Sequence, residues 1–411
     1  MPRVIGLDIH RDFAQAVALD GGNYTQMGRV QLDRDSLTAF GRRLLPSDEI
    51  VLEATANTFA VVRVLRPMVG KIVVANPLQV RLIADAKIKT DKIDAGVLAQ
   101  LQATGFLPQV WIPDQETEIL RRKFSRRSQL VRHRTRLKNE VHAILHSNLI
   151  VQCPVSDLFT ATGKKWLGTQ NLPEGDREAV ERGFRELDRL AADLTALDRD
   201  LATQAVNDVR LQRMITITGI DMVSGLGLLA VIGDHKRFES SEKLVSYFGL
   251  NPSVRQSGNG PARHGRITKR GANLARSLLV EAAWAASRAP GPLRSFFMRV
   301  MARRGSQIAA VATARKLAVI IWHVLHREEE YVFARPSLVG RKRRAVELRA
   351  GRPQQRGRRG IAGRYHNPIT RAEERARLEQ SERAYERVVS GWQPTGPRKP
   401  GRSPRQGDDP K

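Results

Sequence analysis

Four acidic residues in the first hundred positions stand where a small sheet could bring them together. Asp8 lies in a short apolar run, and Glu53 ends the run VLE. Asp91 and Asp94 are three apart, which puts both on one face of a helix. Such a cluster repels itself unless a divalent metal ion neutralises it, and metal ions held by carboxylates activate phosphodiester bonds. The pattern therefore indicates metal-dependent chemistry on nucleic acid.

Each carboxylate also has an ordinary structural interpretation. Asp8 can end a strand, Glu53 can lie on the surface, and Asp91 can cap the helix that contains Asp94. Nucleotide hydrolysis is disfavoured, because an actin-like phosphate loop needs glycine soon after the aspartate and here IHR follows Asp8. The chain also has no GxxxxGK[ST] segment.

A second candidate for chemistry is the hydroxyl of Ser257, in the segment RQSGNGP, whose Gly, Asn and Pro residues exclude regular structure. Helical spacing of apolar residues starts after Asn273, and the free N–H groups of a helix N-terminus favour phosphate. The segment predicts a nucleophile beside a phosphate clamp, and the alternative is a basic surface loop before a core helix. The cationic residues around the hydroxyl are Arg255, Arg263, His264, Arg266, Lys269, Arg270 and Arg276.

The elements that must position the carboxylates form an alternating pattern over residues 1–115. Apolar runs predict strands at 3–9, 14–20, 49–55 and 71–77, with the first two antiparallel. Helical spacing predicts helices at 36–44 and 59–69 and over most of 76–105. We therefore expect an α/β domain with one sheet and interspersed helices.

Residues 116–212 are helical and highly charged. An apolar stripe of Leu130, Leu137, Val141 and Leu145 predicts one packed face. A second helix, 177–206, has leucines at 187, 190, 194, 197 and 201, which suits a coiled-coil arm; a solvated helical spacer is the alternative. Cations on the remaining faces of the first helix could bind a nucleic-acid backbone, and they include Arg121, Arg122, Lys123, Arg126, Arg127, Arg132, Arg134, Arg136 and Lys138.

Residues 213–330 predict a mainly helical domain. The segment 214–238 resembles a helix-hairpin-helix, which contacts DNA phosphates through backbone N–H groups, although Asp221 stands where a second glycine is usual. Residues 336–411 are basic and rich in Gly, Pro and Gln, so we expect a largely disordered tail with one helix at 368–389. This tail would add salt-sensitive affinity for nucleic acid.

The composition restricts the class of protein. A net charge of +27 over 411 residues predicts a polyanionic partner, with nucleic acid before an anionic membrane. The longest apolar run, Met222 to Gly233, is too short to span a bilayer, and MPRVIGLDIH has no signal-peptide core. One cysteine, Cys153, excludes a disulfide framework and a cysteine-based zinc site, which suits the cytoplasm. Metal ligands are expected to be carboxylates.

Five segments over roughly residues 1–325 resemble, in this order, the DEDD transposases of bacterial insertion sequences, which are RNA-guided serine recombinases. The segments are GLDIHRDFAQAVAL, VLEAT, NPLQVRLIADAKIKTDKIDAGVLA, ITGIDMVSGLGLLAVIGD and GLNPSVRQSGNGPARHGRITKRGANLARSLLVEAAW. The resemblance implies a RuvC-like domain of RNase H fold, a coiled-coil arm and a smaller transposase domain. It also implies that Asp8, Glu53, Asp91 and Asp94 are the DEDD set that binds Mg²⁺.

By the same resemblance, Ser257 is the nucleophile, and the two sites join between protomers of a tetramer. A structured bridge RNA would pair with donor and target DNA. Many relatives carry two small hydroxyl residues before two glycines, whereas this chain has QSGN, and Ser253 four residues earlier stays a competing nucleophile.

Two other classes of protein remain open. A RuvC-like nuclease or junction resolvase would use the same carboxylates with water as the nucleophile. A non-enzymatic nucleic-acid-binding protein would explain the charge, but not the ordered acidic positions.

Overall fold

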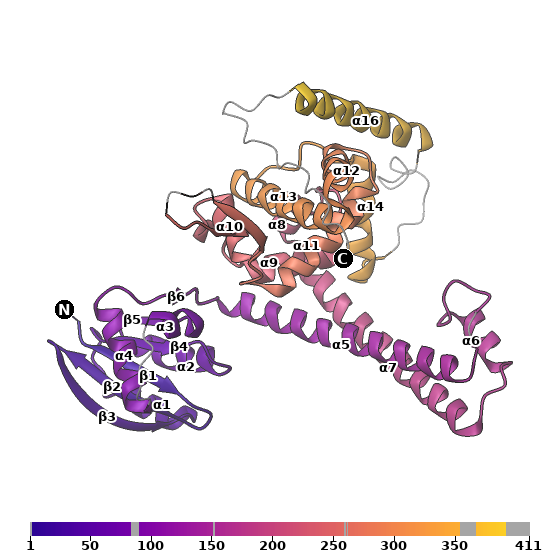
Figure 1. The fold of residues 1–411 in the computed structure, drawn as a ribbon. Helices are drawn as coiled ribbons and strands as arrows, with labels where there is room; N and C mark the ends of the chain where they lie inside the picture. The colour runs from indigo at the N-terminus through magenta and orange to yellow at the C-terminus, as the bar shows by residue number, and fades with distance from the viewer. Residues whose placement is uncertain are drawn as a thin grey trace, which may run out of the picture. The chain divides into compact units, whose positions relative to one another are not determined.

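The computed structural model describes residues 2–83, 90–150, 153–258, 260, 262–353 and 367–391, apart from the side chain of His264. The chain divides into two compact units (Figure 1): the N-terminal unit, Met1–Asp114, and the C-terminal unit, Gln115–Lys411. The N-terminal unit is mixed α/β and the C-terminal unit is mostly helical. The predicted α/β class of the first hundred residues is confirmed.

A six-stranded sheet of order β3-β2-β1-β4-β5-β6 forms the centre of the N-terminal unit. Strands β1, β4 and β5 are parallel, whereas β2, β3 and β6 pair antiparallel with their neighbours. Parallel strands need buried faces, which agrees with the apolar composition of β1 and β4. The bounds are β1 Val4–Ile9, β2 Phe13–Asp20, β3 Asn23–Gln31, β4 Glu49–Glu53, β5 Lys71–Ala75 and β6 Gln109–Val110.

Helices cover both faces of this sheet. Helices α1 (Arg34–Gly41) and α2 (Thr58–Leu65), which the short 3-10 helix η1 (Arg66–Met68) follows, pack on the face that includes Ile5 and Leu7. Helices α3 (Pro77–Ile83) and α4 (Asp91–Ala103) pack on the other face, which includes Val4 and Val51. The predicted strands β1, β2, β4 and β5 and the helices predicted at 36–44 and 59–69 form. The helix predicted over most of 76–105 is α3 and α4 in the described residues, and its residues 84–89 lie outside them. Strand β3 was not predicted, because its side chains are nearly all exposed and give no apolar alternation.

Two long antiparallel helices open the C-terminal unit, α5 (Gln115–Ser147) and α7 (Glu174–Ala205). Leu130 and Leu137 of α5 pack against three leucines of α7, at 187, 190 and 194. The short helix α6 (Ala161–Gly168) contributes to a second apolar cluster with residues near one end of the pair. The predicted leucine stripe therefore does pair the two helices.

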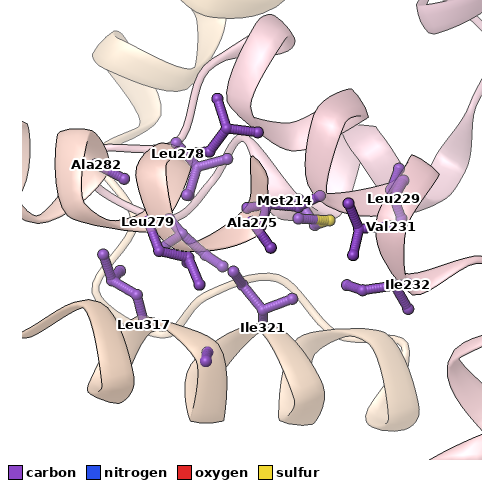
Figure 2. Packing of buried hydrophobic residues seen from close by; sticks show 14 of the residues in the cluster. Met214, Leu229, Val231, Ile232, Ala275, Leu278, Leu279, Ala282, Leu317 and Ile321 are labelled. Atoms are coloured by element: carbon purple, nitrogen blue, oxygen red, sulfur yellow. The ribbon is translucent and has the colours of Figure 1, made fainter. Parts of the chain in front are cut away.

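The main core of the C-terminal unit surrounds α9 (Met222–Ile232), α11 (Asn273–Ser287) and α13 (Ser306–Arg327). Figure 2 shows Leu279 of α11 facing Ile321 of α13 across this core. Helix α13 is long and apolar enough to cross a membrane by composition, but half of its most apolar stretch is buried in the protein, as in a core helix. The remaining elements before residue 330 are α8 (Val209–Met214), η2 (His235–Arg237), α10 (Ser241–Tyr247), β7 (Pro252–Arg255), β8 (Arg263–Ile267) and α12 (Pro292–Arg304).

The segment 214–238, predicted to resemble a helix-hairpin-helix, begins at the end of α8, continues through a largely buried turn into α9 and ends after η2. Gly219 has φ +94°, and a Cβ there would lie 2.2 Å from the carbonyl oxygen of Ala282, so only glycine fits. Asp221 caps α9 in a reciprocal pair with Ser224. The residue that replaces the second glycine thus has a structural role.

The expectation of a largely disordered tail is wrong for residues 336–353 and 367–391, and its remaining part, 354–366 and 392–411, lies outside the described residues. Helix α14 (Pro336–Arg349) buries Val339 and Val346, and helix α16 (Pro368–Gly391) packs against α12. Two cations of α14 have protein partners: Lys342 Nζ donates to the carbonyl oxygens of residues 215 and 217, and Arg343 donates to Glu330. The helix predicted at 368–389 is confirmed as α16.

Candidate active site

Sheet geometry places Asp8 and Glu53 side by side. Strands β1 and β4 are parallel neighbours with Leu7 opposite Leu52, so the next residues, Asp8 and Glu53, lie at the same level. Because side chains alternate along a strand, Asp8 shares the face of Val4, and Glu53 shares the face of the buried residue two before it. This is the face that α4 covers. Both carboxylates are half-buried.

Helix α4 brings the other two carboxylates to the same place. It passes directly over β1 at Gly6, where an added Cβ would lie 1.8 Å from the carbonyl oxygen of Ala95. The N-cap of α4 is Thr90, whose hydroxyl accepts from the amide of residue 93. The interpretation of Asp91 as the N-cap is therefore wrong, and its carboxylate is available for other contacts. Asp91 and Asp94 both lie in the first turn, as predicted.

The pKa values of two of the carboxylates indicate that the acidic side chains lie close together. Burial raises the pKa of Asp8 first, and the carboxylates of Asp94 and Asp91 raise it further, while His10 opposes them. Burial also raises the pKa of Glu53, followed by the charges of Asp8 and Asp94. The raised pKa values of Asp8 and Glu53 mean that negative charge is unfavourable at this place, and a bound divalent cation would relieve it. The oxygen donors fit a hard cation such as Mg²⁺.

His10 lies within this cluster, although sequence reasoning did not include it. Its Nε2 atom is 3.2 Å from Asp8 Oδ2 and 3.4 Å from Asp91 Oδ1. Ligand atoms of these three residues all lie within 4.8 Å of one another. Arg29 approaches the other oxygen of Asp91 at 3.7 Å. The spacing Asp-x-His at the end of a strand was the available signal, because residues two apart point to the same side.

Ser257 lies far from these carboxylates in sequence, in the connection of the β7–β8 hairpin. Strand pairing places Arg255 opposite Arg263, and Ser257 follows in an exposed turn where Gly258 has φ +54°. The carbonyl oxygen of Ser257 accepts from the amide of Gly260 at 3.3 Å. The predicted irregular loop is thus the tip of a hairpin, and part of the basic segment forms β8.

The two candidate serines have different surroundings. Ser253 lies in β7, half-buried at a bulge, and its Oγ occupies the space where a Cβ of Gly265 would be, 2.4 Å from that position. Ser257 is exposed. A hydroxyl at an exposed tip can reach a DNA phosphate more readily than one that faces the opposite strand.

The hairpin cations are exposed. Within the part of the chain that the structure describes, no acidic side chain pairs with Arg255, Arg263, Arg266, Lys269 or Arg270. Arg255 and Arg263 are also directly opposite each other, a like-charge pair that is unfavourable without an anion. The arrangement can bind phosphate beside the serine.

The arginines predicted for the arm have mixed surroundings. Arg121 donates to the carbonyl oxygens of residues 230 and 231 in the last turn of α9, and Arg127 binds Asp198 of α7 through two nitrogens. Arg122 and Arg126 are exposed, with long contacts to acidic residues at 3.3 and 3.8 Å. Arg121 and Arg127 therefore have structural contacts, and Arg122 and Arg126 are the more accessible pair.

Comparison with known proteins finds transposase families that match both the N-terminal and the C-terminal part of the chain. The DEDD_Tnp_IS110 transposase model matches residues 5–149, and the model of the transposase IS116/IS110/IS902 family matches residues 211–298. A probable family 20 transposase of Pseudomonas aeruginosa is 29% identical and covers 80% of this chain and 98% of its own length.

Two other relatives are similar over most of their length. The transposase for insertion sequence element IS1111A of Coxiella burnetii is 25% identical over 80% of this chain and 91% of its own. A pilin gene-inverting protein of Moraxella lacunata is 26% identical over 64% of this chain and 74% of its own length. The four carboxylates lie in the region that the DEDD model matches. The protein is an enzyme that acts on DNA, and it belongs to the DEDD transposase family of insertion sequences.

Proposed function

We propose that this transposase cuts and rejoins DNA through a covalent link to Ser257, with Asp8, Glu53, Asp91 and Asp94 holding Mg²⁺. The observation that carries the proposal is the convergence of the four carboxylates on one face of the sheet, with raised pKa values at Asp8 and Glu53. The DEDD family implies a divalent metal ion. When bound, such an ion would neutralise the carboxylates and withdraw charge from the phosphate under attack.

In the proposed reaction, Ser257 Oγ attacks the phosphorus atom of a DNA phosphodiester and loses its proton. A serine–phosphate bond forms as the bond to one DNA oxygen breaks, and that oxygen leaves as a hydroxyl. Attack by a DNA hydroxyl on the phosphoserine reverses these steps and releases the serine, so the bond energy is kept for rejoining. Arg255 and Arg263 would stabilise the charge on the phosphate oxygens.

The remaining components of the proposal are the fold, the guide and the assembly. We propose that the sheet is of RuvC-like RNase H type, and that the α5–α7 pair is a coiled-coil arm. A bridge RNA would supply sequence specificity, which is consistent with a net charge of +27 and with exposed cations such as Arg122 and Arg126. A tetramer in the cytoplasm, on the nucleoid, would carry out the exchange.

Paired serine variants test the nucleophile. Ser257→Ala should abolish a DNA–protein adduct that survives denaturing electrophoresis, because no Oγ remains to form the bond. Ser253→Ala is the matched control and should keep the adduct. An adduct formed by Ser257→Ala but not by Ser253→Ala would move the nucleophile to Ser253, and an adduct formed by both variants would refute a serine nucleophile at either position.

A metal-dependent nuclease is the second candidate function. The carboxylate cluster favours it, because Asp8 and Glu53 need no serine to activate a water molecule. Ser257→Ala would then cleave DNA at the wild-type rate and leave free 5′-phosphate ends. Retained cleavage of this kind would replace the covalent mechanism.

A further inference from the structure

The His10 imidazole is fixed so that one nitrogen atom points into the carboxylate cluster. Its ring stacks on Phe13, with 4.6 Å between ring centroids and 28° between planes. The backbone amide of His10 donates to the carbonyl oxygen of Phe13 at 2.9 Å, and its carbonyl oxygen accepts from Asn57 Nδ2 at 3.3 Å. Arg29 lies 4.4 Å from the Phe13 ring centroid. The stacking supports one face of the ring, and the two hydrogen bonds fix the backbone that carries it.

The Nε2 atom of His10 lacks the partner that a buried polar atom normally has. It is shielded from solvent, and it makes no hydrogen bond of good geometry within the described part of the chain. Two carboxylates nevertheless lie close, Asp8 at 3.2 Å and Asp91 at 3.4 Å. The Nε2 atom is thus shielded from solvent on a ring that is 39% exposed, and it lies between two carboxylate oxygens at distances that one shared cation would bridge.

The chemical character of this donor set differs from that of carboxylates alone. Oxygen ligands suit both Mg²⁺ and Mn²⁺, whereas an imidazole nitrogen is a poor ligand for the hard Mg²⁺ ion and is accepted more readily by a first-row transition metal such as Mn²⁺. We infer that His10 Nε2 is a metal ligand together with Asp8 and Asp91, and that this nitrogen makes the site bind Mn²⁺ more tightly than Mg²⁺. The inference rests on the proposed carboxylate centre and adds a ligand outside the DEDD set.

An imidazolium ion is the competing role for this side chain. A protonated His10 would form an ion pair with Asp8 and Asp91 and would compete with a metal ion for the same carboxylates. The two roles predict opposite changes in metal affinity when His10 is replaced. Removal of a ligand weakens metal binding, whereas removal of a competing cation strengthens the binding of both metals.

Calorimetric titration of the full-length protein with Mn²⁺ and with Mg²⁺ separates the two roles. His10→Ala and the polar variant His10→Asn should lose at least about tenfold in Mn²⁺ affinity, since even partners behind the first ligands contribute that much. Mg²⁺ affinity should change much less. Tighter binding of both metals by either variant would support the ion pair and overturn the inference. An equal loss of affinity for both metals would also overturn the inference, because it would show no preference of His10 for Mn²⁺.

A spectroscopic signature gives a second readout that does not depend on activity. Electron spin echo spectra of the Mn²⁺-loaded protein should contain coupling to a directly bound nitrogen, and His10→Ala should lack it. His133→Ala is the matched control, because His133 Nε2 also lies near a carboxylate, Glu186, at 3.0 Å. Absence of nitrogen coupling in the wild-type protein would refute the inference.

The carboxylate variants distinguish this failure from failure of the proposed function. Asp8→Ala should lose both Mn²⁺ binding and strand exchange. If Asp8→Ala keeps both, the proposed metal centre is wrong. If Asp8→Ala loses both and the nitrogen coupling is missing from the wild-type protein, only the role of His10 is wrong. Circular dichroism of each variant establishes that the sheet is intact.

Discussion

The carboxylate cluster and the serine hairpin are built in opposite ways. The carboxylates are acidic and half-buried, and their positions are set by paired strands and a helix that crosses β1 at Gly6. The serine lies at an exposed turn among cations that have no acidic partner in the described chain, on a hairpin of two short strands. The carboxylates of the cluster repel one another, and a bound cation would reduce this repulsion. The cations of the hairpin repel one another, and a bound anion would reduce theirs. Metal and DNA phosphate are the complementary ligands.

Loss of one central carboxylate should have the largest effect. Asp8→Ala should lower strand exchange at least about a thousandfold, because metal ions contribute several kcal/mol to stabilisation of the transition state. DNA binding should be nearly unchanged, since the basic surface supplies the affinity. Recombination assays and filter binding in the same buffer measure the two effects.

The control for this experiment lies in the same hairpin. The Asp12 side chain is 82% exposed, and one of its carboxylate oxygens lies 4.0 Å from the neighbouring Arg11. Asp12→Ala should recombine at the wild-type rate. Full strand exchange by Asp8→Ala would eliminate the metal-centre interpretation.

Two arginines at the serine hairpin should show a smaller effect of a different kind. Arg255→Gln together with Arg263→Gln removes a like-charge pair, so the thermal midpoint should stay level or rise slightly. Salt dependence of DNA binding should become shallower, by about 0.9 in the log–log slope per lost phosphate contact. Binding titrations between low and moderate salt measure the slope. An unchanged slope would mean that these cations do not contact phosphate.

Crowding at Gly6 tests how rigidly the carboxylates are positioned. Gly6→Ala places a methyl group against the Ala95 carbonyl oxygen, so α4 must move or the domain must lose about 3 kcal/mol. Metal affinity should fall as well, because Asp91 and Asp94 lie on the displaced helix. Gly96→Ala is the contrasting control in the same domain, because an added Cβ there makes only an ordinary van der Waals contact, 3.5 Å from the ring of Tyr24. Normal stability and metal binding in Gly6→Ala would contradict the close packing of α4 on β1.

The contact between α12 and α16 can be weakened without altering either site. Arg294 donates to both oxygens of the buried Glu382 carboxylate at 2.8 and 2.9 Å. Glu382→Gln should cost about 1–3 kcal/mol, because the guanidinium loses its charged acceptor. Limited proteolysis should then release α16 sooner than from the wild-type protein. Equal proteolysis rates would argue that α16 is held by other contacts.

Replacement of Lys342 should have the smallest effect, a change in how the stability of the protein depends on pH. Burial lowers its pKa to about 8, below the value of about 10.4 in an unfolded chain. Between these values the unfolded state binds more protons, so stability should rise with pH, by about 1–2 kcal/mol from pH 7.5 to 9.5. Lys342→Met should lack this part of the rise in denaturant unfolding. Parallel curves for the two proteins would show that the ammonium is not perturbed.

The same contrast explains which features the sequence could predict. Asp8 and Glu53 follow apolar strands, and Asp91 and Asp94 share a helix face, so periodicity was enough to group them. Strand β3 was not predicted, because an exposed edge strand has no apolar alternation. Helix α14 was not predicted, because its cations are satisfied by distant groups such as the carbonyl oxygen of Ile215, and no local pattern encodes such partners.

His10 shows the same limit at the level of one side chain. Its position two residues after Asp8 was visible in the sequence, but its proximity to Asp91 depends on where α4 packs. That packing depends on the absent side chain at Gly6. Local periodicity therefore predicted which elements bring the carboxylates together, and the tertiary contacts decide which further side chains lie beside them.

The most direct measurement is the chemical identity of the reaction intermediate. Wild-type protein is trapped on a nicked DNA substrate with a divalent metal ion, digested, and examined by mass spectrometry for a nucleotide on the peptide that contains Ser257. A nucleotide linked to Ser257, absent when Asp8→Ala is used, is the predicted result. Cleaved DNA with free 5′-phosphate ends and no nucleotide on any serine would contradict it.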